Sequence, residues 1–115
     1  MKSLPITLDM IEGAYVFLRK TAPFNKWGLP ESDTMSFNVT NSADFGQCWV
    51  NEKGIIGFDI SATKHGHLTT LLSTVAHEMI HLLQLKRGLR LSHNAWFKQK
   101  AALVCRIHGF DPLMF

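Results

Sequence analysis

The segment LTTLLSTVAHEMIHLLQLK, residues 68–86, constrains the fold more than any other part of the chain. Its apolar residues fall on several faces of a helix, and a helix of that kind is buried at the centre of a domain. Gly88 follows as a C-cap, and Lys86 and Arg87 stand in the last turn, where the helix dipole favours cations. The sequence therefore predicts a central helix from Leu68 to Lys86, around which the other elements pack.

Helical patterns also appear near both ends of the chain. Residues 6–22 place apolar side chains at spacings of three and four after Thr7 or Asp9, which are candidate N-caps. Residues 92–109 form the last helical pattern, with Ser92 as its predicted N-cap and Gly109 as its stop. We expect one helix in each region.

Three short segments between the first two helices have the character of strands: TMSFNVT, GQCWVN and GIIGFDIS. The turn NEKG separates the last two, and its Gly54 is suited to a positive φ, so we expect a hairpin there. The predicted architecture is an α+β fold with an N-terminal helix, a small three-stranded antiparallel sheet, the central helix and a C-terminal helix.

Length and composition favour one folded domain, residues 1–115. Hydrophobic residues make up 46% and charged residues 18% of the chain, which excludes a disordered polypeptide. The apolar stretches are too short or too interrupted to cross a membrane, and the N-terminus lacks the pattern of a signal peptide. With only Cys48 and Cys105 present, we expect two reduced thiols and a soluble, cytoplasmic protein.

Charge is uneven along the chain. Residues 1–78 carry a net charge of −2, whereas residues 79–115 carry +5. A basic cluster of this kind is either a solvated helix face or a surface that attracts phosphate backbones and acidic polypeptides.

The predicted central helix contains the pattern H-E-x-x-H, formed by His77, Glu78 and His81. Four residues separate the histidines by one turn and about 40°, so both imidazoles can reach one ion, and zinc suits them. Glu78 would lie beside the metal and hold a water molecule, whose pKa zinc lowers toward about 7. An ionised glutamate in an apolar helix is costly without such a partner, which favours a metal site over a chance match.

A third ligand must come from elsewhere in the chain. A third histidine six residues after His81 would identify a metzincin, but Arg87 stands there, and no glutamate follows Glu78. The remaining downstream candidates are His93, Cys105, His108 and Asp111. We favour His93, because a short connection can bring the first turn of the last helix back against the central helix. We expect His108 to stabilise a helix end and His65 and His67 to lie in a loop or N-cap.

These residues resemble the SprT-like, or Spartan-type, zinc metallopeptidase domain. The likeness runs from about Met35 to Asp111 and rests on H-E-M-I-H followed by His93-x-x-x-Phe97, with GIIGFDIS before the helix. The resemblance implies a zincin-like fold in which His77, His81 and His93 hold Zn²⁺ and Glu78 is the catalytic acid and base. It also implies a protein or peptide substrate and, through the basic C-terminal third, a link to DNA.

The sequence thus predicts a zinc-dependent endopeptidase that cleaves peptide bonds with an activated water, and the resemblance implies that it acts on DNA-associated proteins. The alternative is a zinc-stabilised module that binds nucleic acid or protein without turnover. That module would need a fourth protein ligand, from Cys105 or His108, because structural zinc sites are usually closed by four. Glu78 has no role in such a site, so its presence favours the enzyme.

Overall fold

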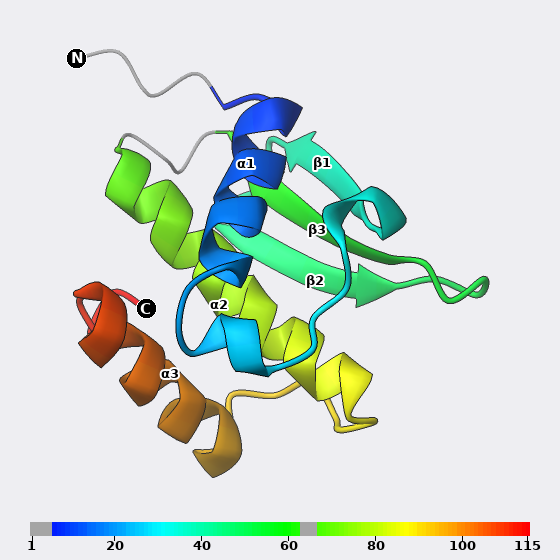
Figure 1. Ribbon diagram of the computed structural model, residues 1–115. Coiled ribbons are helices and arrows are strands. Elements are labelled where there is room, and N and C mark those ends of the chain that lie inside the picture. Colours follow the sequence, from blue (N-terminus) through cyan, green and yellow to red (C-terminus); the bar gives the residue numbers. More distant parts are fainter. Residues whose placement is uncertain (1–5, 63–66) are drawn as a thin grey trace.

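The computed structural model describes residues 6–62 and 67–115 (Figure 1). The helices and strands follow the expected order: α1 (Leu8–Arg19), β1 (Ser36–Thr40), β2 (Gly46–Val50), β3 (Ile56–Ser61), α2 (Leu68–Lys86) and α3 (Ala95–His108). Two short 3₁₀ helices, Phe24–Lys26 and Ser32–Thr34, lie between α1 and β1. The fold is α+β, as the sequence predicts.

The sheet is mixed, which corrects the prediction of a purely antiparallel sheet. Its strand order is β1-β3-β2, with β3 antiparallel to β2 and parallel to β1. The predicted β2–β3 hairpin is confirmed, and Gly54 in its turn has a φ of 80°. Residues 41–45 carry the chain past the place of β3 to the far edge, so β1 and β3 run the same way. The alternating pattern of the strands does not specify which of them becomes central.

α1 and α2 pack against each other and cover one face of the sheet, and α3 packs against α2 (Figure 1). Tyr15 of α1 contacts Phe37 of β1 and Phe58 of β3, with ring centroids 5.7 and 5.8 Å apart. Strand β2 lies close to α2, since a Cβ added at Gly46 would stand 3.0 Å from the γ-methyl of Thr74. The sheet therefore supports α2 from one side.

The predicted bounds of α2 are confirmed. Eleven of its residues are buried, and Val75, Met79, Ile80 and Leu82 are 0% exposed. Each such side chain contributes about 1.5–3 kcal/mol by leaving water, and Leu82→Ala would cost about 2–5 kcal/mol. The helix stops where Gly88 takes a φ of 67°. α2 is thus the fixed central element from which side chains can be aimed.

α3 begins later than the sequence predicts. Its N-cap is Asn94, not Ser92, because the Asn94 side chain accepts a hydrogen bond of 3.0 Å from the main-chain N–H of Phe97. His93 therefore precedes the helix instead of standing in its first turn. Gly109 ends the helix in the left-handed conformation, as expected.

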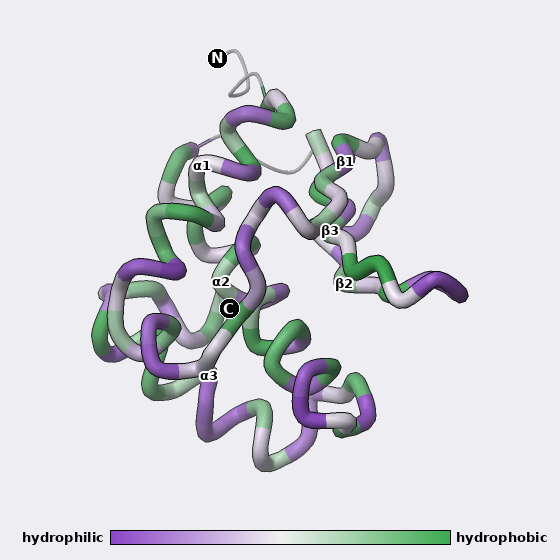
Figure 2. The backbone as a smooth tube through the Cα atoms, turned by 45° about the vertical axis from the view of Figure 1, so that its right-hand side comes forward, coloured by the Kyte–Doolittle hydropathy of each residue, from purple (hydrophilic) through white to green (hydrophobic). Residues whose placement is uncertain are grey.

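Hydropathy along the chain follows this arrangement. In Figure 2 the turn between β2 and β3 projects from the body of the molecule and is hydrophilic at its tip. Within the described ranges, none of the helices has the length and apolar character needed to span a membrane.

Candidate metal centre

His77 and His81 lie one turn apart on α2, and the helix holds them at different depths. His77 is half-buried and His81 is 9% exposed. His93 comes from the connection between α2 and α3 and is exposed. The tight packing of α2 fixes the first two imidazoles, and the Asn94 cap fixes the backbone directly after the third.

The three imidazoles converge through their Nε2 atoms. Nε2 of His93 lies 3.1 Å from Nε2 of His77 and 3.0 Å from Nε2 of His81. Imidazole nitrogens bind zinc at about 2.0–2.1 Å, which places neighbouring nitrogens of a tetrahedral site about 3.3 Å apart. Within the described residues, this trio is the group of histidine, cysteine and acidic side chains close enough to share a metal ion.

In two of the rings, the hydrogen bond made by Nδ1 determines whether Nε2 carries a hydrogen or a lone pair. Nδ1 of His77 lies 3.0 Å from the main-chain oxygen of Phe115, and Nδ1 of His81 lies 2.7 Å from Oε1 of Gln84. Both oxygens are acceptors, so each Nδ1 carries the hydrogen and each Nε2 presents a lone pair. A hydrogen on Nε2 of His93 could bond to only one of these two lone pairs. A metal cation could bind all three Nε2 atoms at once. The donor set therefore fits a metal ion.

Gln84 joins the two halves of the site, and the sequence analysis missed it. It is 1% exposed and donates through Nε2 to the main-chain oxygen of Ser92 at 3.0 Å, while its Oε1 accepts from the N–H of Ser92 at 3.4 Å. These bonds fix the orientation of the amide, so Oε1 must face His81. One buried side chain thus orients one imidazole and holds the residue before another. A buried glutamine in the apolar run LLQLK was the available signal.

Aromatic rings complete the surroundings of the imidazoles. The ring of Phe97 lies 4.7–4.9 Å from each of the three, measured between centroids, and Phe115 lies 5.3 Å from His77. Phe97 belongs to the His-x-x-x-Phe pattern found in the sequence, but the contact with Phe115 had no sequence signal. The contacts restrict the motion of the rings and keep water from their sides.

Burial keeps two of the imidazoles neutral. It lowers the pKa of His77 to about 4, helped by the neighbouring His81 and His93, and opposed by the hydrogen bond to Phe115. Burial also lowers the pKa of His81, although the bond to Gln84 acts the other way. Neutral imidazole is the form that binds a metal, so at neutral pH these ligands need lose no proton first.

Glu78 faces the sheet from α2 and is 4% exposed. Burial raises the pKa of its carboxyl to about 8, and a hydrogen bond from the main chain of Cys48 opposes the rise. At neutral pH the metal-free carboxyl therefore holds its proton, and it becomes a general base only when a nearby positive charge lowers its pKa. Glu78 is therefore not one of the side chains that could share one ion, and it lies next to β2.

The other candidate ligands lie elsewhere. Cys105 is buried outside the trio, and Asp111 accepts a hydrogen bond of 2.9 Å from the N–H of Leu113. Nε2 of His108 lies 2.8 Å from the main-chain oxygen of Ala22, so this histidine ties the end of α3 to the segment after α1. His67 takes the N-cap position of α2 without a side-chain bond, whereas His65 lies outside the described residues.

Neither the single tyrosine, Tyr15, nor Arg90 is among the residues around the three imidazoles. The hydroxyl of Tyr15 donates to the main-chain oxygen of Pro30 at 2.6 Å, and its ring is 0% exposed in the core. Arg90 is exposed on the connection after α2.

Comparisons with models of protein families, with curated proteins and with solved structures find no match to this chain.

Proposed function

We propose that this chain is a zinc-dependent endopeptidase of the SprT-like type with a zincin-like fold. The observation that carries the proposal is the convergence of three Nε2 atoms. In two of the three rings a hydrogen bond at Nδ1 leaves the Nε2 lone pair free to bind a metal. His77, His81 and His93 would hold the metal. Imidazole ligands suit zinc among the common metal ions, and three protein ligands leave a coordination position for substrate.

When bound, zinc would supply Lewis-acid chemistry, lowering the pKa of water and polarising a carbonyl group. Glu78 would take the proton from the attacking water and then give it to the leaving amine. Its burial makes the carboxylate basic, although the charge of a nearby cation would lower its pKa from the value of about 8. Such transfer by a placed side chain contributes about 10²–10⁴-fold in rate.

The outer edge of β2 is the place for an extended substrate. The N–H of Ser61 donates to the oxygen of Phe45 at 2.9 Å, and main-chain groups alternate in direction along an antiparallel pair. Gly46, Cys48 and Val50 therefore direct their main-chain groups away from β3, and the Cys48 amide bonds to Glu78. A peptide paired along this edge would lie next to the proposed base, with little demand on its sequence.

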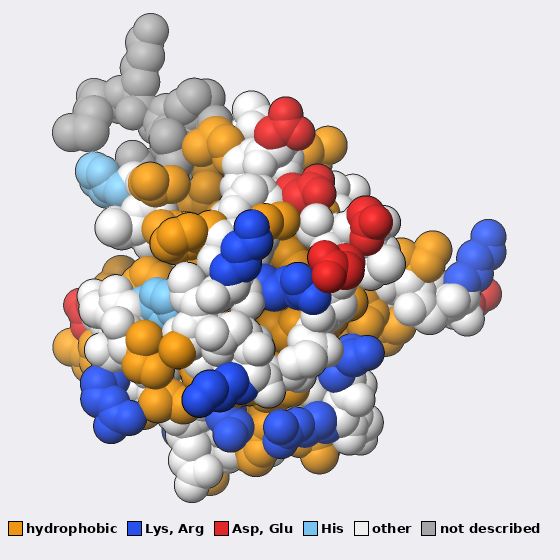
Figure 3. Space-filling view, viewed as in Figure 1, with side chains coloured by type: hydrophobic (Ala, Val, Ile, Leu, Met, Phe, Trp, Pro, Cys, Tyr) orange, Lys and Arg blue, Asp and Glu red, His pale blue; other side chains and the backbone are white. Residues whose placement is uncertain are grey.

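Charge supports a link to DNA-associated substrates. Figure 3 shows Lys and Arg side chains gathered over the lower half of the molecule, whereas Asp and Glu lie mainly in the upper half near α1. The basic residues of positions 79–115 are Lys86, Arg87, Arg90, Lys98, Lys100 and Arg106. A cationic surface attracts a phosphate backbone irrespective of base sequence.

Hydrolysis of a general protein substrate by the zinc-loaded protein, with and without single-stranded DNA, tests the proposal. Glu78→Gln should keep the metal and lose activity, whereas Glu12→Gln on α1 is the matched control and should keep both. Equal cleavage by wild type and Glu78→Gln would overturn the peptidase.

A zinc-stabilised binding module is the competing function. It predicts one zinc per chain, a fourth protein ligand and no cleavage. Cys105 lies outside the trio and His108 bonds to Ala22, which argues against a closed site. Metal analysis of Cys105→Ala and His93→Ala would decide, because only the second should lose zinc in a three-histidine site.

A further inference from the structure

A cavity of about 430 Å³ lies between α3 and the segment that follows it. His77 and His93 form part of its wall, so the space lies beside two of the three converging imidazoles. Its size falls in the range of small-ligand sites, about 300–1,000 Å³. The position beside two proposed ligands, more than the size, indicates a role in the reaction.

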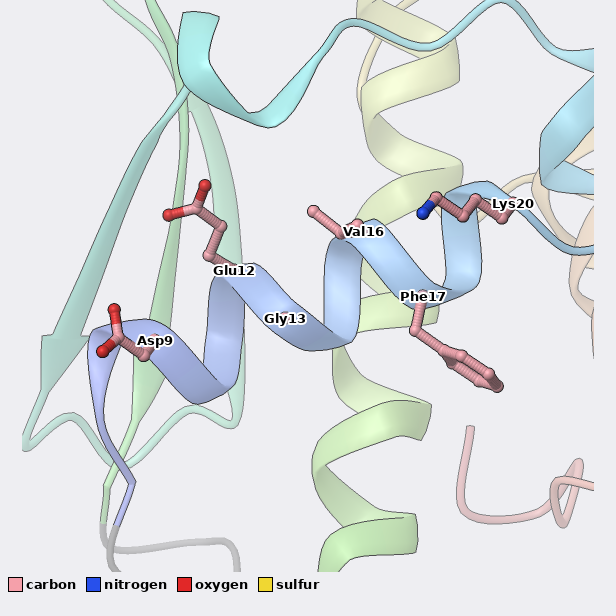
Figure 4. A pocket seen from close by; sticks show the side chains of 6 residues that line it. All are labelled: Asp9, Glu12, Gly13, Val16, Phe17 and Lys20. Carbon is pink, nitrogen blue, oxygen red and sulfur yellow. The ribbon is translucent and has the colours of Figure 1, made fainter.

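Another hollow of the molecule, along α1, lacks that connection. It measures about 530 Å³ and follows an exposed face of the helix, with Asp9 and Glu12 near one end and Lys20 near the other (Figure 4). No proposed ligand is among its lining residues. The larger volume is therefore not the better candidate.

The walls of the cavity beside the imidazoles are mostly apolar. Phe97, Ala101 and Cys105 stand four residues apart and present one face of α3. Two of these side chains are small, which is what leaves the space. Pro112 and Phe115 form wall on the side of the C-terminal segment.

One cation interrupts this lining. Lys98 is exposed and also lines the cavity. An apolar pocket with one positive charge can select peptides in two ways. The apolar wall favours an apolar side chain, and the charge favours an acidic group on the adjacent residue of the peptide.

We infer that this cavity binds a bulky apolar side chain of the peptide substrate next to the bond that is cleaved, and that Lys98 favours an acidic group beside it. The inference rests on the proposed function, because the pocket selects a residue only if the imidazoles hold a metal that reacts with its neighbour. The cavity would add a preference for certain substrate side chains, whereas main-chain pairing along β2 distinguishes little between peptide sequences.

Binding of two hydroxamates to the zinc-loaded protein, measured by calorimetry, tests the cavity without relying on turnover. Acetohydroxamate reaches only a metal ion, whereas 3-phenylpropionohydroxamate adds a phenyl group. The phenyl compound should bind about tenfold more tightly or better to the wild type, because its phenyl group leaves water for an apolar wall.

Filling the cavity should remove this preference. In Ala101→Trp the two hydroxamates should bind with nearly equal affinity, whereas Gln99→Trp, on the same helix outside the cavity, should keep the difference. Acetohydroxamate serves as the internal check that the variant is folded and holds zinc. Ala102→Trp is the second filling variant, because Ala102 lines the cavity but is exposed and tolerates a large side chain.

A third probe, the monohydroxamate of 2-benzylsuccinic acid, places a carboxylate beside the phenyl group. Lys98→Gln should weaken its binding by up to about fivefold, the range of an exposed ion pair, and Lys100→Gln should not. An unchanged affinity in Lys98→Gln would remove the acidic preference.

The outcomes separate the two proposals. Equal affinity of both simple hydroxamates for the wild type, or a preference that survives both filling variants, would overturn the cavity and leave the metal site standing. A wild type that holds zinc yet binds neither compound would overturn the open coordination position and with it the cavity.

Discussion

His77 and His81 stand on a buried helix, whereas His93 stands on an exposed connection, and the two regions hold their imidazoles by different means. α2 has its side chains packed on most of its circumference, so its histidines are aimed by the helix itself. The connection has little packing, since Leu89, Arg90, Leu91 and His93 are exposed. Its order comes from polar contacts, namely the Gln84 bonds to Ser92 and the Asn94 cap. The candidate metal site thus combines a rigid half with a half that is held by local hydrogen bonds.

The largest difference between the halves should appear when one ligand is removed from each. His81→Ala and His93→Ala should both lose stoichiometric zinc, measured by metal analysis. In the metal-free proteins, however, urea unfolding should show His81→Ala destabilised by about 2 kcal/mol or more, because a buried side chain leaves a cavity. His93→Ala should stay within about 0.5 kcal/mol of the wild type. Equal losses of stability would contradict the division into a rigid half and a half held by local hydrogen bonds.

Gln84→Met should come next in size. It removes the acceptor for Nδ1 of His81 and both bonds to Ser92, so the affinity for zinc, from competition with a chelator, should fall about 10–100-fold. Gln99→Met, at an exposed position of α3, is the matched control. Nitrogen NMR of His81 should show its hydrogen no longer confined to Nδ1, an effect that a general loss of stability would not produce.

Removing a helix cap should have a smaller effect than Gln84→Met. Only one of the two side-chain caps, that of α3, should affect the affinity for zinc. Asn94→Ala and Thr7→Ala remove side-chain caps of α3 and α1, whose bonds are 3.0 and 3.2 Å long. Each should cost about 1 kcal/mol in unfolding by urea. Asn94→Ala should also weaken zinc binding by a few-fold, because Asn94 follows His93. A similar weakening in Thr7→Ala would show that the metal senses overall stability instead of the connection.

Removal of the metal should give the smallest change in structure. Removing zinc with a chelator should make hydrogen exchange faster at residues 89–94 and leave it nearly unchanged in the middle of α2. Exchange reports local opening, and packing that does not involve the metal protects the buried helix. A matching acceleration in α2 would indicate that zinc, and not the core, holds the helix in place.

The contrast between α2 and the connection after it also explains which parts of the fold and of the candidate site could be predicted from the sequence. The bounds of α2 and its stop at Gly88 follow from local periodicity and capping, and the histidine pattern on it follows from the turn of a helix. His93 was reachable because few ligand-type residues lie downstream of His81. These inferences need only short-range physics, which a single sequence records well.

Long-range pairing is harder to predict. The parallel pairing of β1 with β3 depends on which strand takes the centre, and each strand alone fits several orders. Asn94 replaced Ser92 as the cap because both are good N-cap residues and the choice depends on where the connection meets α2. The contact between His77 and Phe115 joins residues far apart in the chain, and nothing local marks it.

The bond from Nδ1 of His77 to the main-chain oxygen of Phe115 also bears on when the site can form during synthesis. The ribosome delivers the chain from the N-terminus, so α2 can fold against the sheet well before residue 115 is available. The acceptor for His81 is Gln84 of the same helix. The acceptor for His77 is available only when the segment after α3 has folded back against α2. A nascent chain would therefore carry an incompletely oriented set of imidazoles. Orientation of His77 would be complete only once residue 115 has left the ribosome and the segment after α3 has folded back.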